Sequence, residues 1–159
     1  MDPLLKAMLF SLLPVSELRG GIPIAVLGGI NIYTAFIACV IANILVIPFV
    51  FLFLETIHQG LYNLSWYRKI ADKFLERTRK KVHKKVEKYG YFGLFLFTAI
   101  PLPITGAYTA TVGAWFLGMN RWKSFGAITT GVLCAGIIVS VVVTLGIEAL
   151  KIFIKMNGG

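Results

Sequence analysis

Three long runs without a charged side chain constrain the fold of this chain more than any other feature. They extend over residues 20–54, 89–120 and 124–147. Each run is longer than the roughly 20 apolar residues that cross the hydrocarbon core of a bilayer. Hydrophobic residues make up 57% of the chain, whereas soluble domains have roughly 45–50%. We therefore expect an all-α integral membrane protein with a single membrane domain over residues 1–159, placed in the cell membrane as a multi-pass protein.

The two apolar halves of the chain repeat one another at an offset of 89 residues. This shift places Pro14 on Pro103 and aligns the Gly-x-Asn segment of residues 29–31 with that of residues 118–120. Between residues 14–54 and 103–143, seven of 41 positions are identical, and the matches cluster at the proline break and at the Gly-x-Asn turn. Repeats with helix breaks in corresponding positions point to a transporter binding site. We assign repeat one to residues 1–54, a basic linker to residues 55–88 and repeat two to residues 89–159.

Positive charge is concentrated in the linker between the halves. Ten of the sixteen Lys and Arg residues lie from Arg68 to Lys88, together with only three acids. The pattern predicts an amphipathic, mostly basic helix, and the positive-inside rule places residues 66–88 in the cytoplasm. A polybasic segment beside a span also favours contact with anionic lipid headgroups. The net charge of +9 therefore indicates membrane lipids as partners, with no nucleic acid.

Each half contains two short apolar arms around a proline break, followed by one long span. Arms of about 10 residues would reach only ~15 Å, half the hydrocarbon thickness, which is typical of re-entrant hairpins. A hairpin plus one span, at residues 31–54 and at about 122–147, gives each half an odd number of crossings. The halves would then be inverted repeats. The alternative is that both broken segments cross as kinked spans, which gives four helices and parallel halves. Both models satisfy the positive-inside rule, and segment length favours the hairpin.

Glu17 and Arg19 are the only charged side chains inside the apolar halves away from their ends. Such a charge costs ~2.5–3.5 kcal/mol at membrane depth, so these residues usually pair, face a water-filled cavity and mark a transport pathway. A low dielectric favours the neutral form of a carboxyl group, so Glu17 is the candidate for exchanging protons or cations. Arg19 suits a counter-ion to Glu17 or a clamp for an anionic substrate. A structural salt bridge that locks the hairpin is the competing interpretation.

The backbone around both breaks completes the predicted substrate or ion site. Non-helical backbone at membrane depth is tolerated only where protein or water satisfies its polar groups, so both breaks should line a cavity. The remaining candidates are Pro14, Ser16, Gly20 and Gly21 in the first half and Pro103, Thr105, Gly106, Tyr108 and Thr109 in the second. Ser and Thr side chains also serve as hydrogen bonds between membrane helices, and for Asn43 we favour such a bond over a place in the cavity.

The two break segments carry a resemblance to a known family. Ser16-Glu17-Leu18-Arg19-Gly20-Gly21-Ile22-Pro23 and Pro101-Leu102-Pro103-Ile104-Thr105-Gly106-Ala107-Tyr108 resemble the two signature segments of the small multidrug export family, which is distantly related to the DedA superfamily. The resemblance implies re-entrant loops that enter from opposite faces and a transporter-like role. DedA relatives imply proton-coupled transport or translocation of anionic lipids such as polyprenyl phosphates. The second half departs from their acid and arginine pairs, because Gly106 and Tyr108 align with Glu17 and Arg19.

These features predict a secondary transporter, proton or ion coupled, for a small organic or amphiphilic anionic substrate. The alternative is a lipid scramblase or flippase acting on phospholipid or polyprenyl phosphate, and a structural or assembly factor is a third reading. No nucleophile with a base, no metal-ligand spacing and no phosphate loop is present in the sequence, so we expect no enzyme and no cofactor. Two hairpins and two spans form only a thin shell, so we expect a homo-oligomer, at least a dimer. Its contacts should use the small-residue faces at Gly126, Gly131 and Ala135 to Gly136.

Overall fold

Every regular element in the part of the chain that the structure describes is a helix. The computed structural model describes residues 2–61, 89–101 and 106–157. The helices are α1 (Pro3–Ser11), α2 (Glu17–Leu27), α3 (Ile32–Leu61), the helix Tyr89–Ala99, α5 (Ala107–Phe116) and α6 (Arg121–Asn157). The all-α prediction is confirmed for these residues. The predicted linker helix at residues 66–88 lies outside them.

Two of these helices are long and apolar enough to cross a membrane, Ile32–Leu61 and Arg121–Leu150. The predicted spans begin within a residue of these helices, and both helices continue beyond the predicted ends of the spans. Predicted repeat one stopped at residue 54, whereas α3 continues to Leu61. Between Leu54 and Gly60 the sequence contains no proline or glycine. The helix can therefore continue through the more polar residues that follow the apolar run.

The long helices expose large apolar side chains. Ile41, Leu45 and Phe49 of α3 are exposed, as are Val142 and Leu145 of α6. Exposed apolar patches of this kind mark surfaces that meet lipid or another protein. Together with the length of the two helices, they agree with a membrane protein.

The chain divides into two compact units, and both long helices contribute to each. Unit 1 consists of Met1–Asn43 and Leu133–Gly159, and unit 2 consists of Ile44–Val132. The first helical pair, α1 with α2, belongs to unit 1. The helix Tyr89–Ala99 and α5 belong to unit 2.

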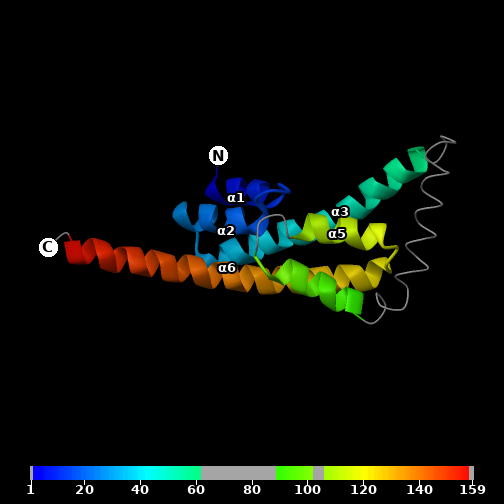
Figure 1. Ribbon diagram of the computed structural model, residues 1–159. Coiled ribbons are helices and arrows are strands. Elements are labelled where there is room, and N and C mark those ends of the chain that lie inside the picture. The colour runs from blue at the N-terminus through cyan, green and yellow to red at the C-terminus, as the bar shows by residue number, and fades with distance from the viewer. Residues whose placement is uncertain (1, 62–88, 102–105, 158–159) are drawn as a thin grey trace. The chain divides into compact units, whose positions relative to one another are not determined.

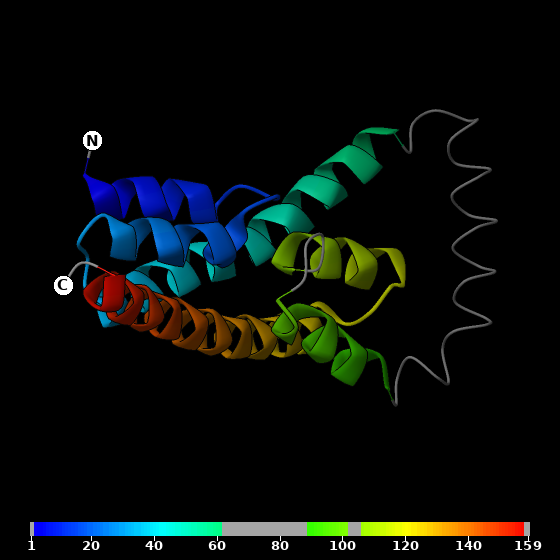
Figure 2. The same cartoon turned by 60° about the vertical axis from the view of Figure 1, so that its left-hand side comes forward.

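In unit 1, α1 and α2 form a helical hairpin (Figures 1 and 2). Asp2 caps α1, because its Oδ1 accepts a hydrogen bond of 3.0 Å from the backbone N–H of Leu4. The chain turns between Ser11 and Glu17, which is where the proline break was predicted. A Cβ atom added at Gly28, just after α2, would lie 2.7 Å from Cβ of Pro3 at the start of α1. The broken segment therefore returns to the place where it began.

In unit 2 the second broken segment also returns to its start. The backbone N–H of Asn120 donates a hydrogen bond of 3.2 Å to the hydroxyl oxygen of Tyr91. The ammonium group of Lys123 lies 6.0 Å from the centre of the same ring. The residues after α5 are thus held beside the first turns of the helix Tyr89–Ala99. The predicted break itself, with Pro103 and Thr105, lies at residues 102–105, outside the described residues.

The 89-residue offset reappears in the helix boundaries. Helix α2 ends at Leu27 and α5 ends at Phe116, while α3 begins at Ile32 and α6 begins at Arg121. Both pairs of residues are separated by the predicted offset. The weak sequence repeat therefore corresponds to a repeat of local structure.

The turn between the short and the long helix has the same geometry in both halves. Gly29 and Gly118 have positive φ angles of 85° and 65°, a conformation that glycine adopts at no steric cost. Each follows a helix end in a Schellman motif, in which backbone N–H groups cap the last helical carbonyls. The equivalent bonds are Ile30 to Ala25 and Met119 to Ala114, both 3.0 Å long. Asn31 and Asn120 then cap the next helix, because their Oδ1 atoms accept from the N–H groups of Tyr33 and Lys123.

Small residues on α6 pack inside the chain. A Cβ at Gly131 would lie 2.7 Å from Cβ of Thr98, and one at Gly136 would lie 2.8 Å from the ring of Phe36. Ala135 is also buried. The prediction that Gly131 and the Ala135 to Gly136 step face another subunit is therefore wrong, because these positions let neighbouring helices of the same chain approach. Gly126 alone of the predicted set is open, with nothing within 4 Å of its added Cβ.

Candidate functional site

Glu17 is a buried acid at a strained position. It is the first residue of α2 and only 6% exposed. Its φ angle of 46° is the one positive value among the described non-glycine residues. Such a conformation is uncommon for a side chain of this size and persists only where the surroundings enforce it, often at functional sites. The helix break thus turns the only acid of the first apolar half into the protein interior.

Arg19 lies two residues further along α2 and is half-buried. Its guanidinium group and the carboxylate of Glu17 interact electrostatically. The structure therefore brings together the two charged residues that the sequence singled out. Their pairing agrees with a counter-ion role or a structural salt bridge, and the role of Arg19 as a clamp for an anionic substrate stays a prediction.

The other first-half candidates form the frame of the hairpin. The Ser16 hydroxyl donates to the carbonyl oxygen of Phe10 and so ties the break back to α1. Pro14 is exposed in the bend. A Cβ at Gly20 would lie 2.8 Å from Cβ of Ser16, so this glycine allows the tight start of α2. These residues shape the break.

Gly21 is the contact point of three helices. A Cβ added there would collide with Oγ of Ser11, would lie 2.7 Å from the carbonyl oxygen of Ala7 and would lie 3.0 Å from Sγ of Cys39. Gly21 thus joins α1, α2 and the first part of α3 within unit 1. Its predicted place in the substrate or ion site stays a prediction.

The contact between Gly21 and Cys39 sets the register between α2 and α3. The two helices run antiparallel after a short turn (Figure 2). Glu17 on α2 and Asn43 on α3 each lie four residues from this contact, Glu17 before Gly21 and Asn43 after Cys39. Both side chains are buried in unit 1.

Asn43 is a buried polar residue of α3 whose surroundings differ from those predicted. Its side chain is 1% exposed, and neither its Nδ2 nor its Oδ1 atom has a hydrogen-bond partner among the described residues. The expected interhelical hydrogen bond is therefore not observed. Leaving buried polar atoms unsatisfied costs about 1–3 kcal/mol. Asn43 therefore holds a buried donor and a buried acceptor that no described residue satisfies.

The second half does not reproduce this polar pair. At the 89-residue offset, Glu17 and Asn43 correspond to Gly106 and Val132, and both of these are buried. Tyr108 is half-buried and Thr109 is exposed on α5. The buried hydroxyl of this helix belongs to Thr111, which donates a bond of 2.6 Å to the carbonyl oxygen of Ala107. Among the described residues, the buried acid and the unpartnered amide therefore occur in the first half alone.

The described residues contain no group of three His, Cys, Asp or Glu side chains that could hold a metal ion. What unit 1 offers instead is a carboxylate, a guanidinium and a carboxamide in an apolar setting. Leu18 and Ile22 beside them are almost completely buried. In such surroundings charges and hydrogen bonds act more strongly than in water. The arrangement can bind and release a proton or hold a polar ligand.

Comparison with known proteins places this site at the edge of a family match. Residues 17–138 match the family model described as "Putative small multi-drug export protein". The match begins at Glu17 and includes Asn43 and both long helices up to residue 138. No curated protein and no solved structure matches the chain.

Proposed function

This chain belongs to the small multi-drug export family, and from that premise we propose that it is a secondary membrane transporter coupled to protons or cations. The observation that carries the proposal is a buried acid at a helix break, Glu17, together with a buried amide, Asn43, that has no hydrogen-bond partner among the described residues of the same unit. A helix interior built for packing alone would gain stability by replacing both with apolar residues. Their presence in the apolar interior supports a binding role.

The proposed topology has two re-entrant hairpins and two spans, with the halves inverted. Both broken segments return to their starts, at Pro3 with Gly28 and at Tyr91 with Asn120. A segment that returns in this way adds no crossing, so each half crosses once and the second half starts from the opposite face.

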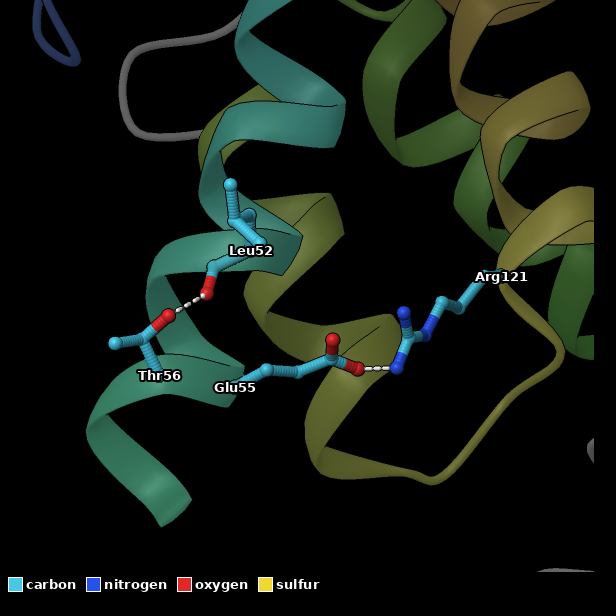
Figure 3. Close-up of polar contacts among 4 residues, drawn as sticks. All are labelled: Leu52, Glu55, Thr56 and Arg121. Atoms are coloured by element: carbon cyan, nitrogen blue, oxygen red, sulfur yellow. Dashed lines mark hydrogen bonds and ion pairs between the residues drawn. The ribbon is translucent and has the colours of Figure 1, made fainter. Parts of the chain in front are cut away.

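An ion pair in unit 2 supports the same topology. Glu55 lies near the end of α3 and Arg121 begins α6, and their side chains form a salt bridge (Figure 3). If residues 89–120 crossed the membrane, the end of α3 and the start of α6 would lie on opposite surfaces. The pair therefore favours the hairpin over the four-span alternative. The basic linker, which follows α3, would place this surface in the cytoplasm.

In the proposed mechanism Glu17 takes up and releases the coupling proton or cation. Arg19 lies within electrostatic reach of this carboxyl group, and Leu18 and Ile22 beside it are almost completely buried. Asn43 offers a donor and an acceptor to the substrate or to the protonated carboxyl group. Arg19 binds an anionic group when Glu17 is neutral, which suits a small organic or amphiphilic anion. We further propose that at least two copies assemble to enclose the pathway.

Transport by purified protein in proteoliposomes tests this function. The probe would be a fluorescent organic anion, carboxyfluorescein, with ethidium as a cationic comparison, under an imposed pH gradient and under none. We expect the anion to move in response to the gradient, at a rate above that of protein-free vesicles. Rates that equal the protein-free vesicles for both probes, or that ignore the gradient, would argue against a coupled transporter of organic anions.

A further inference from the structure

Unit 2 contains a surface pocket of about 500 Å³ that the proposed transport mechanism does not use. Its apolar walls include Phe51 and Leu52 from α3 and Trp122 and Phe125 from α6, and Glu55 and Arg121 lie at its polar part. A volume in this range is typical of pockets for small organic ligands. The walls are almost entirely apolar, so the part of a ligand that fills them must be apolar too.

The exposed charge at the polar part of the pocket is positive. Glu55 and Arg121 reach toward each other from α3 and α6 (Figure 3) and form an ion pair. The carboxylate side chain is 22% exposed, whereas the arginine side chain is 60% exposed. A guanidinium group has five N–H donors, so it can bind a second anion from the exposed side. Lys123 is also exposed, two residues further along.

The position of the pocket along the helices indicates how deep it lies relative to the membrane surface. Glu55 ends the uncharged run of α3, and Lys123 precedes that of α6. Trp122, 83% exposed, lies between the two basic residues. Tryptophan and basic side chains at the ends of apolar helices mark the headgroup level of a membrane. The pocket therefore extends from this level towards the apolar part of the bilayer.

We propose that this pocket binds an anionic phospholipid, with one acyl chain against Phe51, Leu52 and Phe125 and the phosphate on Arg121. Free phosphate would bind only at the cationic end and would not contact the apolar walls. A cationic amphiphile would fill the walls but meet the exposed positive charges. The lipid site is separate from the Glu17 site and does not depend on transport.

Fluorescence quenching of Trp122 by brominated lipids tests this site in the full-length protein. Trp66→Phe and Trp115→Phe leave Trp122 as the only tryptophan, and the vesicles contain unlabelled lipid with either brominated phosphatidylglycerol or brominated phosphatidylcholine. We expect the anionic lipid to quench at roughly fivefold lower mole fraction, the factor for one basic residue near an anionic headgroup. Glu55→Gln with Arg121→Gln keeps the net charge and should reduce this preference to below about twofold.

The repeat supplies a matched control. Tyr33 is the equivalent of Trp122 at the 89-residue offset and is 76% exposed, but its neighbours Ile32 and Thr34 carry no charge. A single tryptophan at Tyr33→Trp, with Trp122→Phe, should show no preference between the two lipids. Arg121→Gln alone keeps Glu55 and provides a second variant, in which the preference for the anionic lipid should also fall below about twofold, if the double variant does not fold.

Three results would overturn the proposal. They are equal quenching of Trp122 by the two lipids, an unchanged preference in both charge variants, and stronger quenching by a brominated cationic amphiphile. Relief of quenching by millimolar inorganic phosphate would show that the site recognises the free anion and not the lipid.

Discussion

Replacing Glu17 with glutamine should abolish the dependence of transport on the pH gradient and lower the gradient-driven rate at least about tenfold, which corresponds to ~1.4 kcal/mol of lost coupling. Glutamine keeps the size of the side chain and most of its hydrogen-bonding reach, but it cannot carry the charge that exchanges with the proton. Glu17 is buried beside Arg19 in unit 1, so the loss should come from chemistry and not from a disturbed surface. The measurement is carboxyfluorescein transport in proteoliposomes over a series of imposed gradients.

Glu148→Gln is the matched control for this variant. Glu148 lies on α6 and is exposed, so its replacement removes the same charge without touching the break. It should leave the rate and its pH profile unchanged. If Glu17→Gln transports like the wild type with the same pH profile, Glu17 serves only as a structural partner of Arg19 and the coupling role is wrong.

Replacing Asn43 with valine should make the protein more stable and less active. The repeat suggests the substitution, because Val132 is the equivalent of Asn43 in the second half and is buried in the same way. Removing two buried atoms that have no partner among the described residues should stabilise the fold by about 1–3 kcal/mol. The substrate or the protonated Glu17 would lose its hydrogen-bonding partner, so transport should fall at least about tenfold, the factor for ~1.4 kcal/mol. Thermal unfolding in detergent and proteoliposome transport measure the two effects.

Ser124→Ala separates the two effects. The Ser124 hydroxyl is also buried and unpartnered in the described residues, and alanine is its repeat equivalent at Ala35. This variant should gain a little stability and keep full transport, because Ser124 belongs to unit 2 whereas Glu17 and Asn43 belong to unit 1. A destabilised Asn43→Val variant, or one that transports normally, would contradict the role assigned to Asn43.

Much of the fold could be predicted from the sequence because it depends on local chemistry. A glycine at a helix C-terminus, followed two residues later by a capping asparagine, specifies the turn at Gly29 and again at Gly118. The 89-residue offset between the two halves therefore relates the end of α2 to the end of α5, and the start of α3 to the start of α6. Glu17 and Arg19 could be found in the same way, since charge inside an apolar run is conspicuous.

The partners across helices could not be predicted, because they depend on which faces meet. Small residues let any helix approach, and the sequence does not say whether Gly131 faces a neighbour in the same chain or in another copy. The sequence predicts an interhelical hydrogen bond for Asn43, and only the structure shows that its buried amide has no partner among the described residues. The ion pair between Glu55 and Arg121 joins a residue assigned to the linker and one assigned to repeat two, which no local pattern connects.

Cysteine labelling from each side of the membrane tests most directly the claim that each half returns to its starting surface. In a background with Cys39→Ala and Cys134→Ala, single cysteines at Asp2, Tyr33, Tyr89 and Lys123 would be labelled with a membrane-impermeant maleimide, in intact cells and after permeabilisation. We predict that positions 2 and 33 share one surface, and that positions 89 and 123 share the opposite one. Labelling of the two members of either pair from opposite surfaces would contradict the hairpins and the inverted arrangement that rests on them.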